Sequence, residues 1–329
     1  MAHRYCLLLQ ALLLSNVNDG EEMTYQHIVS DFYIRNWRKA GVEKVWVYDK
    51  RTGHKGTRSP GKIFGEPDHY EAKDAVANGK TADKSLQFFE GTFAPVLKAL
   101  PNRLRISASE SVIDACKFVV SKFAVMQFLR GRMFKKWQRT ETEFLDGTAQ
   151  QFGFDRGEEH SPQKQQADVM LSQAMSDYYT DKLLLYTWSV RAAPEGSSFY
   201  LGDEPIVIIP KDRNSPPIFD SPGVEIHVPI CPEFCFCITA TQPGDEGQRS
   251  LTPDDQFVLW QRYRASVYAT QHVVCRDDDF LACEAACRLH PEIADPTRPI
   301  MKYELVGLRV IPSCARRTEP GAEQGSTKQ

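Results

Sequence analysis

The stretch Gln26–Trp37 reads QHIVSDFYIRNW and concentrates hydrogen-bonding and aromatic side chains in a short segment. Its pattern predicts about three turns of helix. His27 and Asp31 would share one face of that helix, and Tyr33 and Asn36 would share another. A carboxylate beside a histidine can hold the imidazole in one tautomer for proton transfer. The stretch therefore predicts either a catalytic histidine or a structural one that is tied to the backbone.

The rest of the chain predicts a hairpin, three long helices and then a series of short strands. Expected helices are 83–100, 107–129 and 165–191, followed by shorter ones from 252 and near 278. Expected strands are 43–50, 62–64, 199–201, 206–209, 225–228, 234–238, 267–275 and 303–310. The second long helix opens with Ser107-Ala108-Ser109-Glu110, the pattern of a capping box. This order predicts an α+β fold: long central helices packed with a mainly antiparallel sheet, plus an N-terminal helix and hairpin.

Length and charge limit the classes of function. The 329 residues include 40 Lys and Arg and 43 Asp and Glu, for a net charge of -3. Such a balance gives no general attraction to nucleic acid or to an anionic membrane, so we expect no membrane association and only a local nucleic-acid contact, if any. The partner is expected to be a ligand or substrate whose identity the sequence leaves unknown.

The N-terminal segment raises the question of where the folded domain begins. A leucine-rich run after His3 and Arg4 resembles the core of a signal peptide, but it is too short to span a bilayer and no small-x-small cleavage site follows it. Met23 lies just before His27 and favours an extension or non-native start at residues 1–22, with secretion as the alternative. We expect one composite domain over 23–311 and a disordered tail over 312–329.

Nine cysteines are scattered along the chain, an odd number that does not suit a secreted disulfide framework. Reduced thiols in a cytoplasmic protein are the simpler interpretation. The spacing shows no Cys-x-x-Cys pair, so no metal site is expected from it. The sequence also has no phosphate-binding glycine loop, dinucleotide fingerprint or nucleophile elbow, and it leaves any cofactor unknown.

Two polar residues interrupt the apolar face of the second long helix. Gln127 and Arg130 lie one turn apart, beside core residues, so the arginine needs a buried partner. Glu90 on the preceding helix is the expected one. Further basic residues follow at Arg132, Lys135, Lys136 and Arg139. They predict either a contact with phosphate or, more simply, an exposed basic end of the helix.

A pair of acids, Asp203-Glu204, stands between two expected strands and precedes Pro205. Carboxylates at the end of a strand often act as general bases or metal ligands. The same residues also suit a simple turn, since Gly-Asp-x-Pro is favourable turn chemistry.

The motif His27-x-x-Ser30-x-x-Tyr33-Ile34-x-Asn36-Trp37 resembles the opening of a mostly bacterial family called domain of unknown function 4238, which reads His-x-x-Pro-x-x-Tyr-Leu-x-Asn-Phe. Further similar segments follow in the same order over residues 26–281: 45–49, Glu90, 127–130, 201–205 and 228–232. Ser30, Trp37 and Glu204 depart from the family pattern, which puts a shared activity in more doubt than a shared fold. The resemblance implies one composite domain and no established activity, and it adds Asp203 to the candidate site.

Two hypotheses follow, and the sequence leaves open whether the protein is an enzyme. In the first, a hydrolase-like enzyme acts on a phosphorylated or nucleic-acid substrate. His27 is its acid or base, Asp203 its orienting group or metal ligand, and Arg130 its anion contact. The substrate-binding residues are then Tyr33, Asn36, Glu90 and Gln127. In the second, the protein binds or senses a ligand without catalysis, and these residues form a buried structural network.

Overall fold

The computed structural model describes residues 25–67, 69, 82–152, 168–169, 172–212, 215–240, 253–298, 301–306 and 309–314. The expected extension at 1–22 lies outside these residues, as does the expected tail beyond 314. The domain boundaries proposed from the sequence therefore remain predictions, except that a strand continues to residue 314.

Two four-stranded antiparallel sheets form the β part of the fold. The first has the order β5-β9-β8-β7 and the second has the order β3-β2-β10-β6. Their strands are β2 (Val45–Asp49), β3 (Lys55–Arg58), β5 (Thr187–Ala192), β6 (Leu201–Gly202), β7 (Val207–Ile209), β8 (Glu225–Cys231), β9 (Phe234–Thr239) and β10 (His272–Cys275). Two smaller pairs join β1 (Tyr25–His27) to β4 (Gly65–Pro67) and β11 (Met301–Val306) to β12 (Arg309–Cys314).

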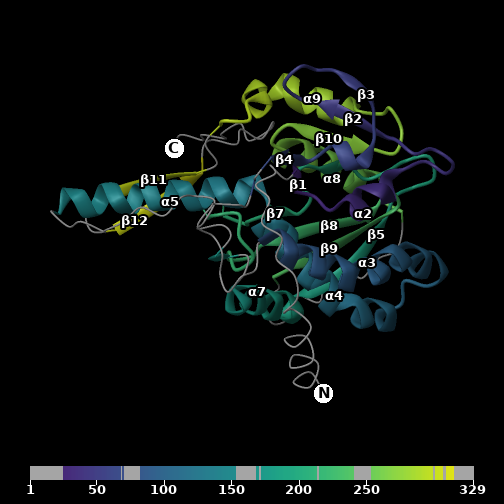
Figure 1. Cartoon of the computed structure of the whole chain (residues 1–329), viewed down its shortest axis with the longest axis horizontal. Coiled ribbons are helices and arrows are strands. Elements are labelled where there is room, and N and C mark those ends of the chain that lie inside the picture. Colours follow the sequence, from purple (N-terminus) through teal and green to yellow (C-terminus); the bar gives the residue numbers. More distant parts are fainter. Residues whose placement is uncertain are drawn as a thin grey trace, which may run out of the picture.

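Helices flank the first sheet on both sides (Figure 1). The bounds are α2 (Asp31–Ile34), α3 (Ala82–Ile106), α4 (Glu110–Leu129), α5 (Arg132–Gln151), α7 (Gln173–Leu185), α8 (Asp255–Tyr268) and α9 (Leu281–Leu289). In Figure 1, α3, α4 and α7 lie on one side of the sheet, and α8, α9 and the second sheet lie on the other. Helix α5 extends away from this body with the β11–β12 hairpin beside it. The α+β prediction is confirmed.

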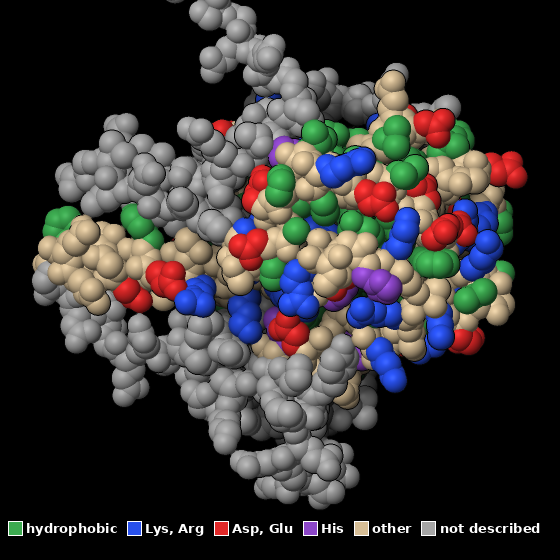
Figure 2. Space-filling model, turned by 90° about the horizontal axis from the view of Figure 1, so that it is seen from above, with side chains coloured by type: hydrophobic (Ala, Val, Ile, Leu, Met, Phe, Trp, Pro, Cys, Tyr) green, Lys and Arg blue, Asp and Glu red, His purple; other side chains and the backbone are tan. Residues whose placement is uncertain are grey.

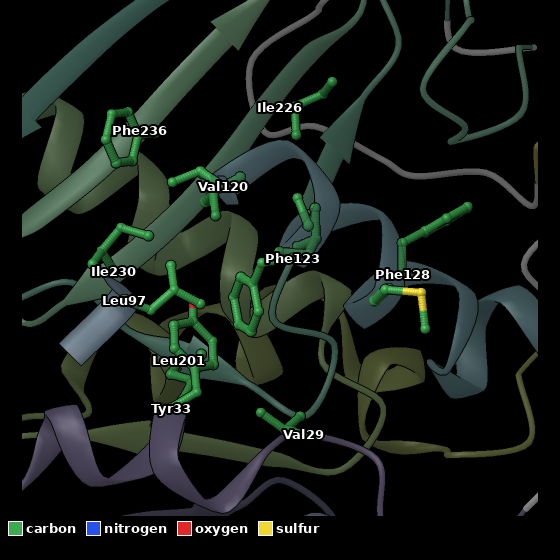
Figure 3. Packing of buried hydrophobic residues seen from close by; sticks show 14 of the residues in the cluster. Val29, Tyr33, Leu97, Val120, Phe123, Phe128, Leu201, Ile226, Ile230 and Phe236 are labelled. Atoms are coloured by element: carbon green, nitrogen blue, oxygen red, sulfur yellow. The ribbon is translucent and has the colours of Figure 1, made fainter. Parts of the chain in front are cut away.

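The main core lies between the first sheet and the α3–α4 pair. Figure 3 shows Tyr33, Leu97, Val120 and Phe123 gathered against strand residues such as Phe236. The rings of Tyr33 and Phe123 meet edge to face with centroids 4.7 Å apart. Both rings are buried, so they combine the removal of a large apolar area from water with a favourable ring geometry. None of the helices in the described part of the chain is long and apolar enough to cross a membrane.

The opening stretch is not helical throughout, which corrects the sequence prediction. Gln26 and His27 belong to β1, which pairs with β4, and the helix begins only at Asp31. Ser30 precedes that helix in an extended conformation, and its hydroxyl makes no capping bond. The helix signal in the sequence extended too far because tertiary pairing with a strand forty residues away decided the first turn.

Other features also differ from expectation, including the strand expected over 267–275, which is confined to β10 because α8 continues to Tyr268. The return strand of the first hairpin is β3, whereas residues 60–62 form a 3-10 turn. The third long helix ends at Leu185, and the segment from Thr187 onward is strand β5. Ser109 precedes α4 but no side chain completes a capping box there. Helix α5 was not expected as a separate element, because Gly131 breaks the helical run only briefly.

Candidate functional site

A buried network links the opening stretch to two helices. The hydroxyl of Ser30 donates to Glu90 Oε1 at 2.8 Å and accepts from Gln127 Nε2 and Arg130 Nη1, each at 3.0 Å. Arg130 Nη1 also donates to Glu90 Oε1 at 2.7 Å, and its Nη2 donates to the backbone carbonyl of His27. We call Ser30, Glu90, Gln127 and Arg130 the serine network. The ion pair expected between Arg130 and Glu90 is present.

Three side chains of the opening stretch bind backbone carbonyls of β8 and of Phe199, which precedes β6. Tyr33 donates its hydroxyl to the carbonyl of Pro229, and Asn36 Nδ2 donates to the carbonyl of Ile230 at 2.9 Å. Trp37 Nε1 donates to the carbonyl of Phe199 at 3.0 Å. Each bond satisfies a backbone acceptor that burial has removed from water. Tyr33 and Asn36, expected to bind substrate, therefore hold α2 against β8.

Asp203 is completely buried and is the centre of a second network. Its carboxylate accepts from Arg132 Nη1 at 2.9 Å and from the hydroxyl and backbone N–H of Thr270. The backbone N–H groups of Gln271 and His272 donate to it at 2.9 and 3.2 Å. Burial opposes ionisation of this carboxyl, but the positive charge of Arg132 and the hydrogen bonds outweigh it and lower the pKa of Asp203. We call these five residues the aspartate network.

Arg132 extends the aspartate network to strand β4. Its Nε donates to Glu66 Oε1 at 2.7 Å, and Glu66 Oε2 lies 2.8 Å from His69 Nδ1. The hydrogen bond from His69, helped by the charge of Arg132, lowers the pKa of Glu66 to about 2. Burial lowers the pKa of the His69 imidazole. Neither Glu66 nor His69 was a candidate from the sequence, because only the folded chain brings them beside Arg132.

Glu204 is adjacent to Asp203 but sits in the opposite environment. It is 4% exposed, and one carboxyl oxygen accepts from the backbone N–H of Met133 at 2.9 Å. Burial, followed by the negative charge of Asp203, raises the pKa of Glu204 to about 8. The carboxyl is therefore protonated at neutral pH and can donate a hydrogen bond. In the sequence, Glu204 stands out only as part of the possible turn at Asp203-Glu204-Pro205.

Glu204 lines the larger of two pockets that flank the end of α4. This main pocket, with its open mouth, encloses about 420 Å³. Apart from Gln127, Glu204 and Tyr268 its lining is apolar, and the Tyr268 hydroxyl already donates to the carbonyl of Ile208. The full lining is Gln127, Phe128, Met133, Phe134, Trp137, Glu204, Pro205, Ile206, Ile208, Pro217, Ile218 and Tyr268.

The second pocket has the serine network in its wall. It encloses about 260 Å³ with its mouth, and its apolar lining comes from α2, α3 and α4. Ser30, Glu90, Gln127 and Arg130 supply all of its polar lining. Gln127 lines both pockets, donates its amide N–H to Ser30, and has a buried Oε1 without a hydrogen-bond partner among the described residues. The amide of Gln127 thus stands between the two cavities.

The sequence-predicted site residues divide between these features. Arg130 belongs to the serine network, and Asp203 belongs to the aspartate network through Arg132, on the other side of Gly131. The backbone carbonyl of His27 accepts a hydrogen bond from Arg130. Neither His27 nor Asp203 lines either of the two pockets, whereas Arg130 lines the second. The structure therefore brings Glu90, Gln127 and Arg130 together, and it adds Glu204.

The basic residues at the start of α5 all have protein partners. Arg132 pairs with Glu66 and Asp203, and Lys135 Nζ donates to the carbonyl of His69 at 3.1 Å. Lys136 donates to the carbonyl of Pro296, and Arg139 pairs with Glu143 at 2.7 Å. On the face shown in Figure 2, Lys and Arg side chains are interspersed with Asp and Glu. The basic side chains that could have bound phosphate are therefore already paired with acceptors of the protein.

Comparison with known proteins relates this arrangement to one family. Residues 25–275 match the family described as "Protein of unknown function (DUF4238)". The chain belongs to this family. The DUF4238 match runs from the first residue of β1 to the last residue of β10, so it contains both networks and every residue that lines the two pockets. No curated protein and no solved structure matches the chain.

Proposed function

We propose that this protein binds a small, largely apolar molecule in the main pocket, with Glu204 as the polar contact. The proposal rests on one observation: the buried carboxyl group of Glu204, whose pKa burial raises to about 8, lines a cavity whose other walls are almost entirely apolar. Apolar pockets with a few convergent polar groups and a perturbed pKa are the usual form of small-molecule sites. This corresponds to the binding or sensing hypothesis.

The pocket's polar groups define the chemistry of the ligand. Protonated Glu204 offers an O–H donor, and Gln127 offers an amide oxygen without a partner among the described residues. A matching ligand has an aromatic or aliphatic body and a neutral polar edge that carries both an acceptor and a donor. A carboxylate or phosphate group would lie beside Glu204, close to the negative charge of Asp203, which would disfavour it.

Binding is tested by screening neutral aromatic and aliphatic compounds for a shift in melting temperature. Ile218 is partly exposed at the pocket wall, so Ile218→Trp fills the cavity without forcing a large side chain into the closed core. Genuine ligands shift the wild type and lose at least about tenfold in affinity in Ile218→Trp, which corresponds to about 1.4 kcal/mol. Val96→Trp on the exposed face of α3 is the control and retains binding. Ligands that bind Ile218→Trp as tightly as the wild type would refute the proposal.

A hydrolase-like activity on a phosphorylated or nucleic-acid substrate is the second candidate. Its support is the neighbouring carboxyl pair, because environments that move two pKa values apart are a common way to assign an acid and a base. In this version Glu204 is the general acid, while Asp203 and Arg132 orient the site. A phosphodiesterase and nuclease screen compares wild type with Glu204→Gln and Asp203→Asn. Activity that survives in folded Glu204→Gln would exclude this role.

We also propose a cytoplasmic location. The support comes from the described cysteines: Cys116, Cys231, Cys235, Cys237, Cys275, Cys283 and Cys287 are all free, and all except Cys287 are buried. Free thiols persist in a reducing compartment. Fractionation of cells that produce the full chain, followed by immunoblotting, tests the location. Recovery in a secreted or periplasmic fraction would contradict it.

A further inference from the structure

A cluster of possible metal ligands lies on the first sheet, away from both pockets. Residues Glu225 and His227 are two apart on β8 and therefore point to the same face. The register places Cys237 of β9 opposite His227, so the Cys237 side chain lies on the same face as Glu225 and His227. One ligand atom from each of the three residues lies within 4.8 Å of the others. His227 Nε2 is 2.5 Å from Glu225 Oε1, and Cys237 Sγ is 3.6 Å from the same oxygen.

The cluster is part of the interior rather than a group of surface residues. His227 is completely buried and Cys237 is 7% exposed, while 37% of the Glu225 side chain remains accessible. The second ring nitrogen of His227, Nδ1, is buried without a hydrogen-bond partner among the described residues. Such unsatisfied groups are rare in interiors, and an unseen water or ion is one explanation for them. The accessible carboxylate gives an ion a way in from solvent.

The surroundings hold the imidazole in place. Phe257 of α8 covers its ring, with centroids 5.1 Å apart, and the guanidinium of Arg191 lies over the same phenyl ring at 5.3 Å. Arg191 is on β5, next to β9 in the sheet, and its Nε is also buried without a hydrogen-bond partner among the described residues. The Phe257 ring on one side and the neighbouring strands on the other therefore fix the positions of the three side chains.

We propose that Glu225, His227 and Cys237 bind a zinc ion, with a fourth coordination position open to solvent or to a small ligand. Cysteine, histidine and carboxylate are all ligands that Zn²⁺ takes, and three protein ligands with one open position is the usual form of a zinc site that exchanges its fourth ligand. The thiolate and the imidazole favour zinc over Mg²⁺ and Ca²⁺, which prefer oxygen ligands alone.

The charges of the site also suit a divalent ion. On binding, Cys237 loses its thiol proton to solvent, His227 gives a ring lone pair, and the Glu225 carboxylate gives an oxygen. The two negative charges then balance Zn²⁺, and the guanidinium of Arg191, whose charge acts on both Glu225 and Cys237, remains as a further positive charge nearby. Without metal, burial and the charge of Glu225 raise the pKa of Cys237 to about 12, so the thiol keeps its proton until a cation displaces it.

Spacing rules do not detect this site, which explains why the sequence predicted no metal. Two of the ligands are two residues apart on one strand, and the third comes from the partner strand across the β8–β9 turn. Rules based on Cys-x-x-Cys pairs describe ligands that a single loop brings together. Here the strand register of the β8–β9 hairpin brings Glu225, His227 and Cys237 together.

Cobalt substitution and zinc titration of the full-length protein test the proposal. The metal-free wild type should take up one Co²⁺ with a near-ultraviolet thiolate-to-cobalt charge-transfer band, and zinc should displace it. Cys237→Ala should lose the band, and Glu225→Gln should weaken zinc binding at least about tenfold, because the loss of even an outer-shell carboxylate costs about that much and Glu225 is proposed as a ligand. Cys235→Ala is the matched control because it lies on the same strand and face, and it should keep the band. Circular dichroism confirms that each variant is folded.

Several outcomes would overturn the site. The first is a wild type that shows no charge-transfer band at saturating Co²⁺, whatever the variants do. The second is a band that remains in Cys237→Ala, because the thiolate ligand would then lie elsewhere. If Cys237→Ala does not fold, Glu225→Gln decides the matter, since its side chain is partly exposed and its replacement keeps size and shape. Unchanged zinc affinity in that variant refutes the proposal.

Discussion

Asp203 and Glu204 are adjacent in the chain and both buried, yet their carboxyl groups are driven toward opposite protonation states. Asp203 faces Arg132 and a set of N–H and O–H donors, which lower its pKa. Glu204 faces an apolar pocket and has one backbone donor, and its pKa rises to about 8. The peptide between them therefore separates a permanent anion, which fixes the β6–α8 region, from a neutral acid that can respond to pH.

The pH dependence of stability should reveal the raised pKa of Glu204. Between its ordinary value of 4.5 and about 8, the folded protein keeps a proton that the unfolded chain has lost. The contribution of Glu204 to stability therefore falls as pH rises through this range and is constant above it. Glu204→Gln cannot ionise, so its melting temperature relative to wild type should increase from about pH 5 to about pH 9. A difference that is the same at both pH values would contradict the protonated state.

Gly131 is needed because Glu204 approaches the chain closely at the α4–α5 junction. A Cβ at this position would lie 3.1 Å from the carbonyl oxygen of Phe128 and in collision with Glu204 Oε2. Gly131→Ala should therefore cost about 1–3 kcal/mol in urea unfolding, the usual range for overpacking. Gly147→Ala, within α5 with nothing near its Cβ, is the control and should stabilise by about 0.5–1 kcal/mol. Equal effects at the two glycines would show that the close approach has no consequence.

The serine network should contribute strongly to stability. Arg130 is 3% exposed, so Arg130→Met removes the ion-pair partner of Glu90 and the donor to the His27 carbonyl. We expect a loss of about 3–5 kcal/mol in chemical unfolding, typical of breaking a buried pair. The matched variant Arg139→Met removes an exposed pair with Glu143 and should change stability by less than about 1 kcal/mol. If both variants unfold at the same denaturant concentration, the network is not structural.

Substitution of Tyr33 tests whether this residue stabilises the fold or binds the ligand. Its hydroxyl satisfies the buried carbonyl of Pro229, so Tyr33→Phe should lower the free energy of unfolding by about 1–3 kcal/mol. Tyr178→Phe removes an exposed hydroxyl that bonds Asp220 and should have a much smaller effect. Affinity for a ligand of the main pocket should stay unchanged in both variants. A large loss of affinity in folded Tyr33→Phe would return this residue to the binding site.

The fold was largely predictable where the signal was local. Strands β8 and β9 show alternating and β-branched residues. Helix α8 forms close to the helix expected from 252, but its N-cap is Asp254, whose carboxylate accepts from the N–H of Phe257. The prediction was wrong where distant partners decide. His27 is in a strand because β4 pairs with it, and Trp188 is in a strand because β9 lies beside it.

The candidate site was predictable only in part for the same reason. A buried arginine on an apolar helix face requires a partner, and this argument identified Glu90 for Arg130. The role of Glu204 depends on its burial with a single backbone donor, which arises only when α5, β7 and the segment around Ile218 come together. No spacing along the chain records that environment. The same holds for the His227–Cys237 pair, which exists only in the register of two strands.

The position of β10 in the second sheet has a consequence for how the protein is made. β10 lies between β2 and β6, and its residue His272 pairs with Asp49. During synthesis the β2–β3 hairpin leaves the ribosome long before its central neighbour exists, so one of its edges stays open through most of translation. Long-range pairing of this kind is slow, and open edges invite association with other chains. The edge of the β2–β3 hairpin therefore lacks its partner strand until the end of the DUF4238 segment has emerged.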